Sequence, residues 1–166
     1  FDGRAGAGVA WVWDGALDAG RPVVVYTAHR STQDIRYRYA RWDGAAWRDY
    51  EIARAGSSLS GEDIFYAGGI CLDPDRPGTV FLSSNADLVT GQPAGRYELH
   101  RGVTPDGGAT WQWTALTANS SVDNLRPLVP ERHPAGDFVL WLRGAYTRYT
   151  NFATEVVLGR EGPPRP

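Results

Sequence analysis

The chain has 166 residues, of which 42% are apolar and 22% are charged, and its formal net charge is −2. This length is enough for one domain with a packed core, and the charge balance lacks the basic surplus that nucleic-acid binding requires. The single cysteine, Cys71, excludes an internal disulfide and a cysteine-based zinc site, and no apolar stretch is long enough to span a membrane.

Short runs of β-branched and aromatic residues, bounded by Gly, Pro and Asp, predict strands along the whole chain. No helical stretch of useful length interrupts them. In chain order, the runs occupy residues 9–13, 22–27, 35–39, 69–74, 79–84, 97–102, 111–113, 126–130, 138–143 and 154–158. We therefore expect an all-β fold with many turns.

The most specific motif is the octapeptide Thr-Pro-Asp-Gly-Gly-Ala-Thr-Trp at residues 104–111. Asp106 can accept hydrogen bonds from nearby amides, and the two glycines can adopt positive φ. Trp111 provides a large apolar anchor. The motif predicts a tight hairpin turn whose outgoing strand enters the core. Asp43-Gly44 followed by Trp47 is a degenerate version of the same pattern.

This octapeptide resembles the Asp-box of the sialidase-like (BNR-repeat) β-propellers. The resemblance implies β-propeller blades, each a four-stranded antiparallel sheet, with the Asp-box as a folding device remote from the active site. About three such units fit the chain, at approximately residues 9–52, 66–116 and 124–158. The residues that match the Asp-box pattern are Thr104, Asp106, Gly108, Thr110 and Trp111.

Three blades are too few for a closed propeller, which typically has four to eight. We expect a partial propeller over residues 1–159 and a disordered tail at 160–166. Because the chain begins at Phe1 and contains no methionine, we expect upstream blades to be missing. The alternative is self-association, in which a second chain completes the ring.

Residues 37–44, 68–74 and 124–127 are similar to bacterial BNR-repeat-containing proteins related to ulvan-lyase-like polysaccharide lyases. The resemblance implies a cleft that binds an acidic polysaccharide. In those lyases a histidine and a tyrosine transfer protons during β-elimination, and an arginine neutralises the uronate carboxylate. The histidine motif expected in the early blades is absent from this sequence.

Asn124-Leu125-Arg126-Pro127 contains the first candidate site residues. Pro127 favours an extended conformation at Arg126, which would direct the guanidinium into a central cleft. Similarity to the arginine-isoleucine-proline motif of sialidases implies that Arg126 binds a carboxylate, with Asn124 beside it. The alternative is an arginine at a strand entry that pairs with Asp123.

A second candidate group follows the strand at 138–143. Elimination needs a base, an acid for the leaving oxygen and a cation that stabilises the developing charge. Tyr146 beside Arg143 would provide the base and the cation, and Tyr149 would add a substrate contact. The alternative is that Arg143 ends a core strand while Tyr146 covers the edge of a blade.

Tyr66 and His29 are the remaining catalytic candidates. Tyr66 follows a Gly-Ser-rich loop and would act as an acid, a base or a stacking platform, or would simply close the top of a blade. His29 ends a predicted strand and would act as a general base, or would be an ordinary solvated histidine. No group of His, Asp and Glu has metal-ligand spacing, so we expect no metal and no cofactor, and a turn at Asp73-Pro74-Asp75.

The leading hypothesis is an extracellular or periplasmic polysaccharide lyase that cleaves a uronate-containing glycan. Its expected partner is an acidic polysaccharide or oligosaccharide, and neither nucleic acid nor a membrane is expected. One alternative is a non-catalytic glycan-binding or scaffold propeller. A second alternative is a sialidase-type glycoside hydrolase.

Overall fold

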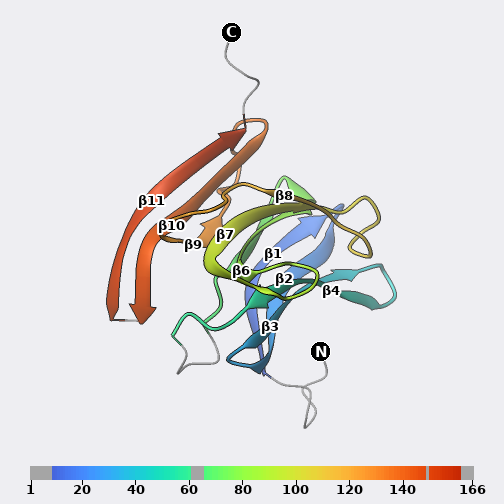
Figure 1. Cartoon of the computed structure of the whole chain (residues 1–166). Helices are drawn as coiled ribbons and strands as arrows, with labels where there is room; N and C mark the ends of the chain where they lie inside the picture. The colour runs from blue at the N-terminus through green and yellow to red at the C-terminus, as the bar shows by residue number, and fades with distance from the viewer. Residues whose placement is uncertain (1–8, 61–65, 149, 162–166) are drawn as a thin grey trace.

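The computed structural model describes residues 9–60, 66–148 and 150–161. These residues form eleven strands and no helix, so none of them belongs to a helix that could cross a membrane. The strands make three separate antiparallel sheets (Figure 1). The predicted all-β class is therefore confirmed.

Each sheet is a meander in which strands adjacent in sequence are hydrogen-bonded neighbours. Sheet 1 contains β1 (Val9–Asp18), β2 (Arg21–Ser31), β3 (Asp34–Trp42) and β4 (Trp47–Gly56). Sheet 2 contains β5 (Ile70–Asp73), β6 (Arg76–Ala86), β7 (Pro93–Val103) and β8 (Gln112–Ala115). Sheet 3 contains β9 (Asp123–Leu128), β10 (Asp137–Arg148) and β11 (Asn151–Glu161).

Sheet 3 differs from the expected four-stranded unit because it has three strands among the described residues. Its last strand, β11, continues to Glu161. The strand therefore extends two residues into the segment predicted as a disordered tail, and residues 162–166 lie outside the described part. The backbone pairing with β10 explains the extension, since Glu161 is opposite Asp137.

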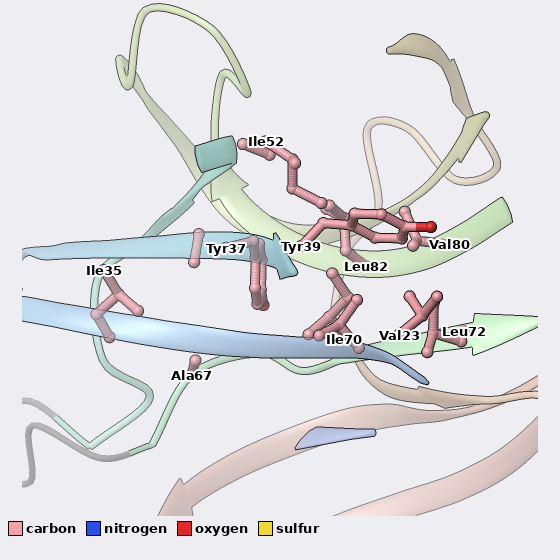
Figure 2. Packing of buried hydrophobic residues seen from close by; sticks show 13 residues of the cluster. Val23, Ile35, Tyr37, Tyr39, Ile52, Ala67, Ile70, Leu72, Val80 and Leu82 are labelled. Atoms are coloured by element: carbon pink, nitrogen blue, oxygen red, sulfur yellow. The ribbon is translucent and has the colours of Figure 1, made fainter. Parts of the chain in front are cut away.

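The main core lies between sheets 1 and 2. Figure 2 shows Tyr37 and Tyr39 of β3 packed with Leu72 of β5 and with Val80 and Leu82 of β6. All five side chains are at most 1% exposed. Burying an apolar side chain of this size stabilises a fold by about 1.5–3 kcal/mol, so this interface is the main source of stability.

A smaller apolar cluster joins sheet 2 to sheet 3. It consists of Cys71, Phe81 and Val139, with Trp141 packed against them. Burial raises the pKa of the Cys71 thiol far above its usual range, which keeps it neutral. Cys71 is therefore an apolar core residue.

The octapeptide turn connects β7 to β8. The amide and the hydroxyl of Thr110 donate to the Asp106 carboxylate at 2.9 and 2.7 Å, and the Gly108 amide donates to Thr104 Oγ1 at 2.7 Å. The pKa of Asp106 is lowered, and the two bonds from Thr110 are the largest cause. The Trp111 indole donates to the Gly108 carbonyl at 2.9 Å, which directs the ring toward the core.

Gly108 is required in this turn for two reasons. Its φ is +114°, and a Cβ at this position would lie 2.6 Å from the Tyr39 ring. The Trp111 ring meets Tyr39 edge-on, with centroids 5.2 Å apart. The turn thus joins sheet 2 to sheet 1.

Asp43 organises the equivalent turn of sheet 1, between β3 and β4. Its Oδ1 accepts hydrogen bonds from the amides of Ala45 and Ala46, both at 2.8 Å. Trp42 and Trp47 flank the turn with centroids 5.9 Å apart. Sheets 1 and 2 therefore carry aspartate-centred turns at the same place, between the third and fourth strands.

Candidate functional site

The Arg126 guanidinium lies among three aromatic rings. Its Cζ is 5.7 Å from the ring centroid of Trp13, 5.9 Å from that of Tyr66 and 5.3 Å from that of Tyr146. Trp13 belongs to β1, Tyr66 precedes β5 and Tyr146 belongs to β10. We call these four residues the Arg126 site. It forms only when the three sheets come together.

The charge of Arg126 has no acidic partner in the described part of the chain. No described carboxylate lies within 4.0 Å of its guanidinium, whereas Asp123, the predicted alternative partner, lies 3.7 Å from Arg96. Arg126 is partly exposed, so a ligand can reach it. A guanidinium that pairs with no acid among the described residues and lies beside aromatic rings is a suitable group for binding a carboxylate.

The backbone of Arg126 is left-handed, with φ of +52°, so the predicted extended conformation is wrong. Residues 126 and 127 form a bulge, because Leu125 is opposite Leu142 and Leu128 is opposite Leu140. The Arg126 amide donates to the Gly68 carbonyl at 2.6 Å. This contact with the segment that precedes β5 outweighs the local preference that Pro127 imposes.

A buried hydrogen-bond network beneath Arg126 joins the three sheets. The Tyr37 hydroxyl donates to the Ser83 carbonyl at 2.7 Å and accepts from the Gly69 amide at 2.9 Å. Ser83 Oγ donates to the Asn124 carbonyl at 2.5 Å. Tyr37 and Ser83 are fully buried, and burial raises the pKa of Tyr37, so the phenol stays neutral. The network sets the position from which Arg126 projects.

Asn124, a predicted substrate contact, belongs to this buried network. Its side chain is 1% exposed. The amide nitrogen donates to Ser120 Oγ at 3.0 Å, and Oδ1 accepts from the Trp141 indole at 2.9 Å. The structure therefore places Asn124 behind the Arg126 site, where it holds β9 in place.

His29 also lies behind the site. It is in β2 and 1% exposed, so the alternative of a solvated histidine is wrong. Its Nε2 shares a hydrogen bond of 2.7 Å with Thr27 Oγ1, which accepts from the Trp13 indole at 3.1 Å. Through Thr27, His29 supports the orientation of Trp13.

Arg143 and Tyr146 are not brought together as predicted. In the β10–β11 pairing Arg143 is opposite Glu155, and its Nη1 donates to Glu155 Oε1 at 3.2 Å. Tyr146 is opposite Phe152 and stacks on it at 5.9 Å. Residues three apart on a regular strand point to opposite faces. The cation beside Tyr146 is therefore Arg126. Tyr149 lies outside the described residues.

Sequence reasoning identified Arg126, Tyr66 and Tyr146 but did not assign Trp13 to the site. The Trp13 run reads as an ordinary strand, and only its contact across the sheets distinguishes it. Its proximity to Arg126 depends on residues more than 100 positions away. No local pattern carries that information.

A second polar cluster, the Asp73 clasp, joins the β5–β6 turn to the segment before β10. The predicted turn is present, since Asp73 Oδ1 accepts from the amides of Asp75 and Arg76 at 3.0 and 3.1 Å. His133 Nε2 lies 3.2 Å from Asp73 Oδ1, and Arg76 bridges Asp73 and Asp137 at 2.6 and 3.0 Å.

The atoms of Asp73, Asp75 and His133 that could ligate a metal ion lie within 4.8 Å of one another. The spacing of these residues in the sequence did not indicate this group. The Asp73 carboxylate is already paired with the Arg76 guanidinium. Burial disfavours the charged form of Asp73, but its bonds to His133 and Arg76 outweigh this effect and lower its pKa. We therefore interpret the clasp as an ionic contact between sheets 2 and 3.

The clasp predicts a pH-dependent stability. Burial disfavours the imidazolium of His133, but hydrogen bonds to Asp73 and the Pro134 carbonyl outweigh it and raise its pKa above 6.5. A raised pKa in the folded state stabilises the fold below pH 6.5, and this stabilisation is lost as the pH rises. We expect the difference in the free energy of unfolding between wild type and His133→Gln, measured by urea denaturation, to shrink as the pH rises from about 6.5 through the raised pKa of His133.

His100 provides the matched control. Burial lowers the pKa of His100 below 6.5, although Glu98 and Asp87 oppose this shift. The contribution of His100 to the free energy of unfolding should therefore be lost as the pH falls. Denaturation curves in which His133→Gln and His100→Gln show the same pH trend would contradict the assignment.

Comparisons with known proteins returned no match: no family model, no curated protein and no solved structure matches this chain. The function must therefore be argued from the site itself.

Proposed function

We propose that this chain is part of a carbohydrate-active β-propeller whose Arg126 site binds the carboxylate of a uronate-containing glycan. The observation that carries the proposal is a guanidinium framed by three aromatic rings, with no described acid beside it. A carboxylate would pair with the guanidinium in a bidentate manner, and the ring faces would pack against the apolar faces of the sugar.

Two features support the propeller assignment. The chain consists of three successive antiparallel meanders, as a series of blades requires. Sheets 1 and 2 also carry their aspartate-centred turns between the third and fourth strands. A glycan polymer as ligand agrees with an extracellular or periplasmic location, which is part of the proposal.

The site contains groups that suit β-elimination. The rings of Tyr66 and Tyr146 both contact the Arg126 guanidinium. A uronate carboxylate bound to Arg126 would therefore place the C5 carbon of the sugar near a phenol oxygen. One tyrosine, acting as the phenolate, would remove the C5 proton and become neutral while Arg126 stabilises the charge on the carboxylate. The C4–O bond would then break, and the second tyrosine would protonate the leaving oxygen. The product is an unsaturated uronate.

A non-catalytic glycan-binding module is the second candidate, and one observation favours it. His29, the only histidine assigned a catalytic role from sequence, is buried behind Trp13 and hydrogen-bonded to Thr27. If the tyrosines do not transfer protons, the same site binds the carboxylate without cleaving the chain.

Titration of the protein with an oligogalacturonate tests these proposals, with indole fluorescence as the readout for binding and near-ultraviolet absorbance for the unsaturated product. Binding with a rise in absorbance supports the lyase. Binding without it supports the binding module, and new reducing ends without it indicate a hydrolase. Absence of both binding and cleavage would overturn the assignment of uronate recognition.

A further inference from the structure

A polar pocket lies on sheet 2, between the β6–β7 hairpin and the segment that follows β8. Its volume is about 410 Å³, within the range of about 300–1,000 Å³ that is typical of small-molecule sites. His100 of β7 lies in its wall, opposite Leu82 of β6 and Ala115 of β8. Gln92 of the hairpin and Asn119 of the segment after β8 also line it. We call this the His100 pocket.

The His100 pocket and the Arg126 site are at the same end of sheet 2. The pocket is lined by the end of β6 and the start of β7, and Tyr66 of the Arg126 site precedes the start of β5. Because neighbouring strands of the sheet are antiparallel, these three strand ends lie at one edge. None of the four residues of the Arg126 site lines the pocket, so the two are separate sites.

The two carboxylates of the pocket are already hydrogen-bonded to the protein. Glu98 accepts from Thr117 Oγ1 at 2.5 Å and from the amide and hydroxyl of Ser120 at 2.7 and 2.8 Å. Asp87 Oδ1 accepts from the amide and hydroxyl of Thr90 at 2.7 and 2.8 Å. Burial disfavours the charged form of Glu98, but its hydrogen bonds outweigh this effect and lower its pKa. Neither carboxylate therefore requires a cationic ligand.

The charges of the pocket also disfavour an anionic ligand. Asp87 and Glu98 are negative, and Arg96 is the positive residue of the lining. Burial lowers the pKa of His100, although Glu98 and Asp87 oppose this shift, so its imidazole is neutral at pH 7. The lining therefore carries a small net negative charge, which repels a carboxylate.

The polar groups that remain available to a ligand are neutral. Among the described residues, no hydrogen bond reaches the side chains of His100, Gln92 and Asn119. A neutral imidazole and a side-chain amide each offer one donating and one accepting group. A sugar hydroxyl both donates and accepts, so these groups match a ligand that carries several hydroxyls. Ala94 and Ala118 also line the pocket and would contact the C–H groups of such a ligand.

We propose that the His100 pocket binds a neutral sugar unit through these groups. The lining defines a neutral ligand with several hydroxyls, and the identification of that ligand as a sugar rests on the proposed function. The position of the pocket supports it, since a glycan held by Arg126 also lies at this end of sheet 2. The pocket is thus a second subsite, and it differs from the Arg126 site in excluding the uronate carboxylate.

NMR titration of the isotope-labelled protein tests the proposal, with the neutral disaccharides cellobiose, lactose and xylobiose as probes. With at least one of them, the amide signals of residues 92–100 and 115–120 should shift in a saturable manner. The indole signal of Trp13 in the Arg126 site should not shift.

Two variants remove the amide groups of the pocket. Asn119→Gly should weaken binding of that disaccharide roughly fivefold, since it removes one neutral hydrogen bond. Glycine adopts the φ of +54° at this position without strain, so the fold is retained. Gln92→Ala should have an effect of similar size. Gln112→Ala is the matched control, because Gln112 is exposed at the start of β8, at the opposite end of sheet 2, and it should leave the affinity unchanged.

Absence of a saturable shift with all of the disaccharides would overturn the proposal, and so would shifts confined to the Arg126 site. Equal weakening by Gln112→Ala would do so too, because it would place the sugar outside the pocket. Titration with oligogalacturonate separates this proposal from the proposed function. If oligogalacturonate binds and no neutral disaccharide does, the pocket assignment alone fails. If a disaccharide binds in the pocket and oligogalacturonate does not bind, uronate recognition alone fails.

Discussion

Replacing Arg126 with glycine is expected to weaken oligouronate binding roughly 100-fold while leaving the free energy of unfolding within about 1 kcal/mol of wild type. Arg126 holds a left-handed φ of +52°, which glycine adopts without strain. The Arg126 amide bond to the Gly68 carbonyl involves only the backbone and is retained. The relief of strain thus offsets the lost ring contacts.

Binding should fall because the guanidinium provides the charged donors. Two charge-assisted hydrogen bonds of about 1.5 kcal/mol each correspond to a loss of roughly 100-fold in affinity. Calorimetric titration with oligogalacturonate measures this loss, and urea denaturation measures stability. Arg126→Ala should lose binding equally but be less stable than Arg126→Gly, since alanine retains the backbone strain.

Arg143→Ala is the control for overall charge. Arg143 is 45% exposed at its side chain and pairs with Glu155, so its removal should change affinity less than twofold. An Arg126→Gly variant that binds as tightly as wild type would show that the carboxylate is bound elsewhere.

Removing the hydroxyl of Tyr37 is expected to cause the largest loss of stability, about 3 kcal/mol. This hydroxyl satisfies the Ser83 carbonyl and the Gly69 amide inside the core. Tyr37→Phe leaves both backbone groups buried without that partner, at a cost of about 1–3 kcal/mol each. Urea denaturation of the variant measures the change in the free energy of unfolding.

Tyr39→Phe is the matched control, from the same strand. The Tyr39 hydroxyl makes one hydrogen bond, to the Pro77 carbonyl at 3.1 Å, and the bond is only partly buried. A loss of about 1 kcal/mol is expected. Equal losses in the two variants would show that the Tyr37 network does not hold the three sheets together.

Several features that the sequence predicts are present in the structure, and each of them depends on short-range chemistry. Alternating apolar residues indicate strands because successive side chains point to opposite faces. Asp106 and Gly108 indicate a turn because the hydrogen bonds and the positive φ that it needs arise within five residues. The proline after Arg126 is also short-range chemistry, but the extended conformation that it predicts is not the one that Arg126 adopts.

Tertiary structure decides which candidates meet. Arg126 reaches Tyr146 and Trp13 because three sheets pack around it, while Arg143, only three residues from Tyr146, pairs with Glu155. The left-handed backbone of Arg126 follows from its bond to Gly68, a residue 58 positions earlier.

The sequence by itself thus determined the all-β class, the strand runs and the aspartate-centred turns, since these depend on neighbouring residues. Only the tertiary structure assembled Trp13, Tyr66 and Tyr146 around Arg126 and placed His29 and Asn124 behind them. The physical reason is that these contacts join residues far apart in the chain, and packing between sheets outweighs the local preference of each residue.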